Sequence, residues 1–189
     1  MMTEVREQKM RRFFNIYDAQ QTGSIGKVNF EQPVQIGASM LGYAPGSAEY
    51  EEMHKWSMGF WHYLKNHLQK SDDSQVQLDE FIKAMDALAS DKKTLNEIIM
   101  GHASFTIKLW DRDGDGMMDE EEFVAAHTAY NTKESAAREA FSHLDRNGDK
   151  LLSYSEIIQA VEEYFVSDDP NAIGNWFIMD PDQAGVSAD

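Results

Sequence analysis

The fold is decided by one stretch of the chain, Asp111-Arg-Asp-Gly-Asp-Gly-Met-Met-Asp-Glu-Glu-Glu122. Calcium is a hard cation that takes about six to eight oxygens, and a twelve-residue loop supplies them from positions 1, 3, 5, 7, 9 and 12. Those positions hold Asp111, Asp113, Asp115, the backbone carbonyl of Met117, Asp119 and Glu122. Gly116, at position 6, suits a sharp turn with a positive φ. Acidic turns also occur on ordinary surfaces, but this spacing of carboxylates predicts a calcium-binding loop.

A second loop follows, Asp145-Arg-Asn-Gly-Asp-Lys-Leu-Leu-Ser-Tyr-Ser-Glu156. Its ligand positions hold Asp145, Asn147, Asp149, the carbonyl of Leu151, Ser153 and Glu156. Lys150 stands at position 6, where a left-handed conformation costs a residue with a Cβ about 1–2 kcal/mol. The loop also offers fewer carboxylates than the loop before it. We therefore predict that it binds calcium more weakly.

Apolar residues with helical spacing flank both loops, which is the pattern of an EF-hand. The same frame occurs twice upstream, around residues 18–29 and 69–80. Position 8 of each loop is apolar and is expected to pair with its partner loop: these residues are Ile25, Val76, Met118 and Leu152. The sequence thus predicts an all-α fold, with four EF-hands in two pairs packed into one compact globule. Short two-stranded bridges are expected between paired loops.

The two upstream loops have lost much of the calcium chemistry. In loop 18–29, Asp18 is the only charged ligand candidate, and Asn29 at position 12 cannot supply two carboxylate oxygens. Because Pro33 fits a helix only in its opening turn, the next helix is expected to begin near Asn29, which then caps it. Loop 69–80 begins with Gln69 and is interpreted as a structural hand. Two calcium sites are expected, and a weak third site at Asp18 stays open.

The linkers and the tail define three regions. Residues 1–90 form the N-terminal pair, with a weakened and a degenerate loop, residues 91–165 form the C-terminal pair, and residues 166–189 form a tail. A capping box of Thr94 and Glu97 is expected to open the helix after the join. The tail carries an apolar segment, Trp176-Phe-Ile-Met179, that either docks on the core or forms an exposed partner patch. Docking is favoured, because monomers seldom tolerate such a patch.

Composition narrows the class of partner and the compartment. The net charge of −16 argues against nucleic acid and against stable association with an anionic membrane. The chain has no cysteine, and its first residues are charged and lack the apolar core of a signal peptide. A cytoplasmic monomer is expected. The sequence contains no nucleophile–base arrangement, phosphate loop or catalytic zinc motif, so it is not expected to be an enzyme.

The degenerate second hand, the tight join and the tail segments 164–169 and 174–177 together resemble the invertebrate sarcoplasmic calcium-binding proteins and the related calexcitin. The resemblance implies a compact cytosolic protein that buffers calcium at its first, third and fourth hands, with magnesium competing at some sites. The third and fourth hands match this pattern. The first hand departs from it at Gln20 and Asn29.

Two other functions stay open at this point. A calcium sensor would expose an apolar groove to a target protein, as calexcitin-like proteins are expected to do. A carrier of the photoprotein or luciferin-binding type would enclose an aromatic ligand. The residues proposed to line such a cavity are Trp56, Trp61, His62, Trp110, His127, Tyr130 and Trp176. The plainer interpretation is that these rings fill the core.

Overall fold

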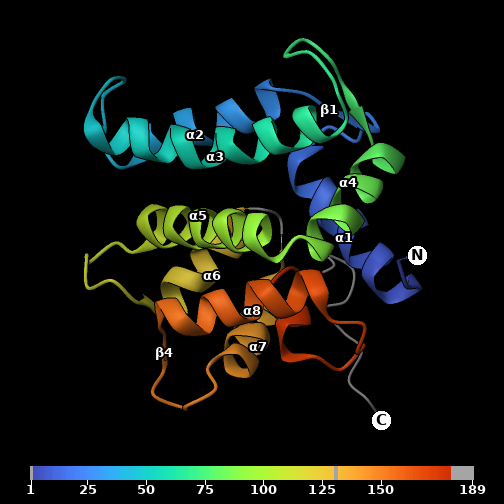
Figure 1. Ribbon diagram of the computed structural model, residues 1–189. Coiled ribbons are helices and arrows are strands. Elements are labelled where there is room, and N and C mark those ends of the chain that lie inside the picture. The colour runs from blue at the N-terminus through green and yellow to red at the C-terminus, as the bar shows by residue number, and fades with distance from the viewer. Residues whose placement is uncertain (1, 130–131, 180–189) are drawn as a thin grey trace.

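Each predicted loop joins two helices, so the computed structural model consists of consecutive helix–loop–helix units (Figure 1). The structure describes residues 2–129 and 132–179. The elements in these ranges are α1 (Glu4–Tyr17), β1 (Ser24–Ile25), α2 (Val28–Met40), α3 (Ala48–His67), β2 (Val76–Gln77), α4 (Leu78–Ser90), α5 (Lys92–Trp110), β3 (Met118–Asp119), α6 (Glu120–Ala129), α7 (Glu134–Leu144), β4 (Leu151–Leu152), α8 (Tyr154–Val166) and the 3-10 helix η1 (Ile173–Trp176). Across these residues, no helix is long and apolar enough to span a membrane.

The loops pair two by two through short antiparallel bridges. β1 pairs with β2, placing Ile25 opposite Val76, and β3 pairs with β4, placing Met118 opposite Leu152. All four side chains are buried, because position 8 of each loop faces the core beneath the bridge. The predicted all-α fold, with hands in two pairs and bridges between the loops, is confirmed.

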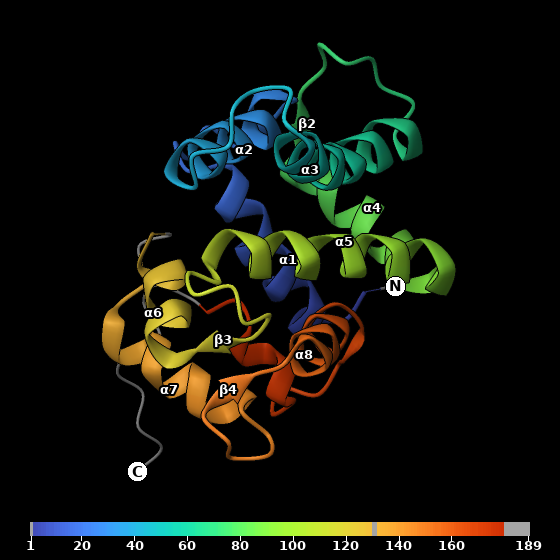
Figure 2. The same ribbon diagram turned by 90° about the vertical axis from the view of Figure 1, so that its left-hand side faces the viewer.

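The helix α5 lies in the middle of the molecule, between the α2–α3 pair and α8, in both views (Figures 1 and 2). Aromatic rings join the two halves into one core. The Phe13 ring of α1 lies 5.5 Å from Phe60 of α3 and 5.1 Å from Phe165 of α8, measured between ring centroids. Such contacts add about 0.5–1.5 kcal/mol each to the burial of apolar surface. The two halves therefore pack against each other through a shared aromatic core.

The helix α2 begins near Asn29, as expected, but its cap and the turn that holds Pro33 differ from the prediction. The helix begins at Val28 with Lys27 as its N-cap, and Pro33 lies in the second turn and not in the opening one. Asn29 is inside the first turn, so it does not cap the helix as an N-cap residue. Its Oδ1 accepts a hydrogen bond from Gly26 N at 2.8 Å, since this amide of the incoming loop lacks a helical partner.

The start of α5 also differs from the prediction. The helix begins at Lys92, and its N-cap is Asp91, whose carboxylate accepts from Thr94 N at 3.2 Å and from Thr94 Oγ1 at 2.7 Å. Thr94 is thus the residue that the cap binds and not the cap itself. A carboxylate accepts both donors and favours the positive end of the helix dipole, which explains why Asp91 takes the position.

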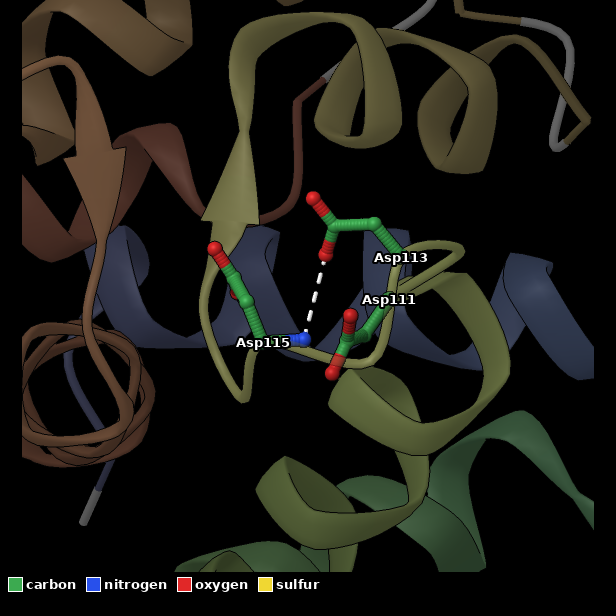
Figure 3. Close-up of side chains that lie close together, drawn as sticks. All are labelled: Asp111, Asp113 and Asp115. Atoms are coloured by element: carbon green, nitrogen blue, oxygen red, sulfur yellow. Dashed lines mark hydrogen bonds between the residues drawn. The ribbon is translucent and has the colours of Figure 1, made fainter.

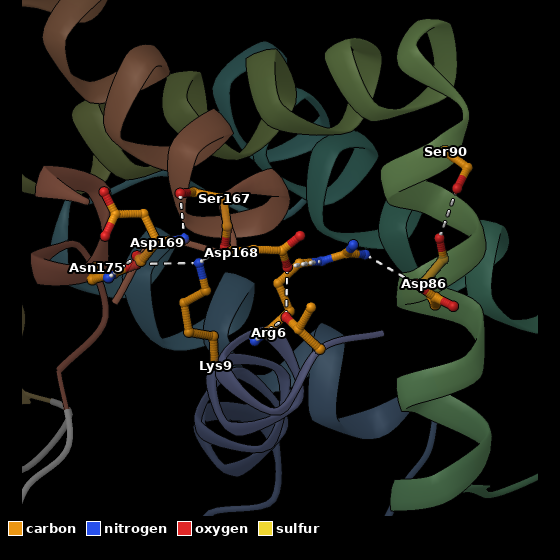
Figure 4. A network of polar contacts seen from close by, with 9 residues as sticks. Arg6, Lys9, Asp86, Ser90, Ser167, Asp168, Asp169 and Asn175 are labelled. Atoms are coloured by element: carbon orange, nitrogen blue, oxygen red, sulfur yellow. Dashed lines mark hydrogen bonds and ion pairs between the residues drawn. The ribbon is translucent and has the colours of Figure 1, made fainter. Parts of the chain in front are cut away.

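The tail runs back over the C-terminal pair and reaches α1. Phe177 and Ile178 are buried in the core. Where η1 crosses α8, a Cβ on Gly174 would lie 2.5 Å from the Ala160 carbonyl oxygen, so the two backbones approach at a distance that only glycine allows. The first part of the tail is tied to α1 by the buried Lys9, whose Nζ donates to the Ser167 carbonyl at 2.6 Å (Figure 4).

Candidate metal centre

The third loop gathers the carboxylates of Asp111, Asp113 and Asp115. Their nearest ligand oxygens all lie within 4.8 Å of one another, and Figure 3 shows the three side chains around the same turn. Asp111 ends α5 as its C-cap residue, while Asp113 and Asp115 are exposed. Three negative charges at this separation repel one another strongly unless a cation lies among them.

The backbone of the loop turns around Asp111. Gly114 and Gly116 have φ values of +76° and +81°, which a residue with a side chain seldom adopts. Their N–H groups donate to Asp111 Oδ1 at 2.7 Å and to Oδ2 at 2.9 Å. Asp115 N donates in turn to Asp113 Oδ1 at 3.1 Å. These bonds orient the carboxylates of Asp111 and Asp113, and Met117 N donates to Asp115 Oδ1 at 2.7 Å. Each carboxylate retains lone pairs for a cation.

Glu122 enters the site from the first turn of α6 and is almost fully buried. Its Oε1 accepts from Arg112 N at 2.6 Å, and its Oε2 accepts from Asp119 N at 3.1 Å. Asp119 Oδ1 accepts from Glu122 N at 2.8 Å, which orients both carboxylates. The glutamate is therefore held with both oxygens at the closing end of the loop, as bidentate binding of a cation requires.

No side-chain cation answers these charges in the described part of the chain. The nearby Arg138 of α7 instead binds the outward-facing glutamates of α6, at 3.2 Å from Glu120 and 2.8 Å from Glu121. Its guanidinium also lowers the pKa of Glu121 below the ordinary value. The third loop is thus an arrangement of oxygens without a positive partner, and a hard divalent cation such as calcium fits that donor set.

The fourth loop has the same backbone with weaker ligands. Gly148 N and Lys150 N donate to the two oxygens of Asp145, at 2.8 and 2.9 Å, and Lys150 has a φ of +68° as predicted. Two donors point at ligand carboxylates. Asn147 Nδ2 lies 3.0 Å from Asp149 Oδ2, and Ser153 Oγ lies 2.6 Å from Glu156 Oε2. Both hydrogens must turn away before a cation enters, which weakens binding.

In the second loop the carboxylate of Glu80 is paired with Lys70, a residue to which the sequence analysis gave no role. Lys70 Nζ donates to Glu80 Oε2 at 2.8 Å and to the Gln75 carbonyl at 2.7 Å. Gln75 and Glu80 stand at positions 7 and 12, where the other loops offer oxygens to calcium. The available signal was a lysine directly after Gln69, in a loop whose first position carries no acid.

The first loop is satisfied without a charge at position 12. Asp18 is buried and accepts from Thr22 N at 2.8 Å and from Gly23 N at 2.7 Å, as the first residue of an intact loop does. At the closing end, however, Asn29 turns its amide nitrogen to the Tyr17 carbonyl at 2.9 Å. A group that donates there cannot serve as a second ligand oxygen.

A cavity of about 550 Å³ lies outside the loops, between α1, α2, α3, α5 and α8. Its lining includes Trp56 and His62, which were among the candidates for an aromatic-ligand site. Four other candidates do not line this cavity, so that part of the prediction is wrong: they are Trp61, Trp110, His127 and Trp176. Tyr130 lies outside the described residues. The four rings pack elsewhere: Trp61 against Phe30, for example, at 5.5 Å between centroids.

The chain is similar to known calcium-binding proteins in both sequence and structure. No protein-family model matches the chain. Calerythrin of Saccharopolyspora erythraea is 26% identical over 170 residues, which cover 87% of this chain and 94% of calerythrin. This similarity spans both pairs of hands.

Solved structures with the same arrangement come from several groups of calcium-binding proteins. A Streptomyces coelicolor calcium-binding protein gives a TM-score of 0.69 at 24% identity, covering 85% of this chain and 97% of its own. The sarcoplasmic calcium-binding protein of amphioxus gives 0.74 at 18% identity, covering 94% and 98%. The calcium-regulated photoprotein mitrocomin of the jellyfish Mitrocoma cellularia gives 0.71 at 18% identity, covering 87% and 85%. At such identities the likeness concerns the fold alone.

Proposed function

We propose that this chain acts mainly as a calcium buffer. The similarities in sequence and in structure support its place in the sarcoplasmic calcium-binding protein and calexcitin-like EF-hand family. The ion is its cargo and no reaction is catalysed. We place the protein in the cytoplasm as a monomer, and its net charge of −16 disfavours nucleic acid and anionic lipid as partners.

The proposed tighter site is the third loop. Its ligands are the side chains of Asp111, Asp113, Asp115, Asp119 and Glu122 and the carbonyl of Met117. The proposed weaker site is the fourth loop. Its ligands are the side chains of Asp145, Asn147, Asp149, Ser153 and Glu156 and the carbonyl of Leu151. Magnesium is smaller and prefers octahedral coordination, so it competes less well where a bidentate glutamate sets the geometry.

The observation that carries the buffer proposal is the docked tail. A sensor needs an apolar groove that opens when calcium binds. Here the C-terminal pair already holds the tail in place: His127 Nε2 of α6 lies 3.1 Å from the Phe177 carbonyl, and the His143 ring of α7 stacks on Trp176 at 4.2 Å. Glu163 of α8 accepts from Gly174 N at 2.9 Å. An intramolecular segment at this place leaves little groove for a target helix.

A calcium titration in millimolar magnesium tests the proposal when it is followed by calorimetry and by a dye that fluoresces on apolar surface. Two equivalents bound, with flat or falling dye fluorescence, are expected. A strong rise in fluorescence would replace the buffer with a sensor and a protein target. A third equivalent would assign a weak site to the first loop at Asp18.

A second candidate function rests on the cavity between the two halves. Its volume lies in the range of small-molecule sites, and aromatic residues such as Tyr17, Trp56, Phe60 and Tyr63 line it. Carriage of an aromatic ligand of the luciferin type is therefore the alternative. Titration with such a compound, monitored by its absorption and by tryptophan fluorescence, tests it. No saturable change in the wild type, or an unchanged response in Trp56→Phe, would argue against this role.

A further inference from the structure

The second hand holds a positive charge of its own at the place where an intact hand receives calcium. Lys70 Nζ bonds to one oxygen from position 7, the Gln75 carbonyl, and to one from position 12, Glu80 Oε2. In the third loop these two positions are Met117 and Glu122. One ammonium group thus bridges the middle and the closing end of the second loop.

The contacts of Glu80 are those of a satisfied closing residue. Its Oε2 also accepts from Gln77 N at 2.9 Å, which is the bond that Glu122 makes with Asp119 N in the third loop. The side chains of Lys70 and Glu80 are 22% and 31% exposed, so water screens their attraction only in part. The bond from Lys70 lowers the pKa of Glu80, which keeps the carboxylate charged.

Another lysine in the same region shows that this placement is specific. Lys65, near the end of α3, pairs with Asp72 at position 4 of the second loop. Asp72 is half exposed and stands at a position that contributes no ligand in an intact hand. Lys65 therefore makes an ordinary surface ion pair, whereas Lys70 binds two groups at ligand positions.

The side chain at position 12 of the first hand also has all-protein partners, although it is an uncharged asparagine. Asn29 Oδ1 accepts from Gly26 N at 2.8 Å, and Asn29 Nδ2 donates to the Tyr17 carbonyl at 2.9 Å. The side chain thereby ties the end of α1 to the start of α2 across the loop. Neither loop of the N-terminal pair leaves a closing carboxylate without a partner.

We propose that the N-terminal pair keeps its paired-loop geometry without metal, with the Lys70 ammonium as the built-in cation of the second hand. The β1–β2 bridge then persists when calcium is removed. The β3–β4 bridge loosens, because Asp111, Asp113 and Asp115 repel one another once their counter-charge is gone. One half of the molecule is a constant scaffold, and the other half responds to calcium.

Amide hydrogen exchange of the full-length protein, with calcium and with excess chelator, tests the proposal directly. Chelation is expected to leave the protection of the Ile25 and Val76 amides within about threefold and to lower that of Met118 and Leu152 by tenfold or more, about the effect of losing 1.4 kcal/mol of local stability. Equal loss of protection at both bridges in the wild type would overturn the proposal.

Substitutions in chelator then ask whether Lys70 is the cause. Lys70→Gln is expected to lower the protection of Ile25 and Val76 by about tenfold, while Lys65→Gln changes it by less than about threefold. Lys70→Arg keeps the charge and is expected to restore most of the protection. If Lys70→Gln leaves the bridge unchanged, the proposal fails. If that variant does not fold, Lys70→Arg and Lys65→Gln decide. Retained protection of Ile25 and Val76 in Lys70→Arg supports the proposal, and a tenfold loss of their protection in Lys65→Gln contradicts it.

Discussion

The two pairs of hands have similar backbones. They differ in the groups that bind the side chain at position 12, which closes each loop. In all four loops the amide of position 9 donates to the side chain of position 12: the acceptors are Asn29, Glu80, Glu122 and Glu156. In the N-terminal pair that side chain is either neutral, as in Asn29, or bound by an ammonium group, as in Glu80 with Lys70. In the described part of the C-terminal pair, Glu122 and Glu156 accept from backbone amides and from no positively charged side chain. The comparison teaches that the apolar frame specifies the fold, whereas the loop oxygens specify the metal.

The largest expected effect comes from Glu122→Gln, compared with the matched change Glu80→Gln. Replacing Glu122 removes a ligand charge and one bidentate oxygen, so calcium affinity of the third hand should fall by about a hundredfold. Replacing Glu80 should leave calcium affinity unchanged, because Lys70 occupies that end of the loop. Calorimetry on both variants measures this. Similar losses of affinity in the two variants would abolish the distinction between the pairs.

The docking of the tail on the C-terminal pair is the next feature to perturb. Ile178→Ala should destabilise the protein by about 2 kcal/mol, since it leaves a cavity at a buried position. Val166→Ala, at the exposed last residue of α8, should change stability by less than about 0.5 kcal/mol. Urea unfolding of both variants measures the difference. A near-neutral Ile178→Ala would show that the tail is not part of the core in solution.

Exchanging the residue at position 6 sharpens the comparison within the C-terminal pair. Lys150→Gly should relieve about 1 kcal/mol of backbone strain and tighten the fourth site by up to about fivefold. Gly116→Ala should weaken the third site by a similar amount. A Cβ there meets no atom within 4 Å, so the positive φ is the only obstacle. Calcium titrations of both variants measure this, and no change in either would mean that the loops tolerate this conformation freely.

The smallest expected effect is a pH dependence at the tail. Burial lowers the pKa of His127 below the ordinary value of 6.5, although the Phe177 and Phe123 carbonyls oppose the shift. As pH falls below about 6.5, the unfolded chain therefore takes up a proton that the folded chain resists, and the free energy of unfolding decreases. His127→Gln should flatten this decrease in chelator. An identical pH profile for the variant would remove His127 from the account.

The paired helix–loop–helix arrangement could be predicted from the sequence, because each of its features follows from the spacing of residues along the chain. The opposition of Met118 and Leu152 follows from an apolar residue at position 8, and the sharp turn at Gly116 follows from the glycine itself. The positive φ of Lys150 was predictable too, since it stands at position 6, where an intact calcium loop turns sharply, as at Gly116.

Side chains whose hydrogen-bond partners depend on three-dimensional neighbours could not be predicted from the sequence. The cap of α5 is Asp91 and not Thr94, because the stronger acceptor took the donors nearby. The place of Lys70 could not be read from the motif, which gives position 2 no ligand role. The cavity lining was predicted poorly because residue type does not say to which side of a helix bundle a ring points.

Gly174 lies where the tail contacts the C-terminal pair, and this contact has no room for a side chain. At this crossing an added Cβ would lie 2.5 Å from the Ala160 carbonyl oxygen and 2.9 Å from Tyr164 N, which are both backbone atoms of α8 and cannot rotate aside. Even the smallest side chain, the methyl group of alanine, would therefore push η1 away from α8. How closely the tail docks on the C-terminal pair thus depends on the absence of a side chain at Gly174, a residue outside all four loops.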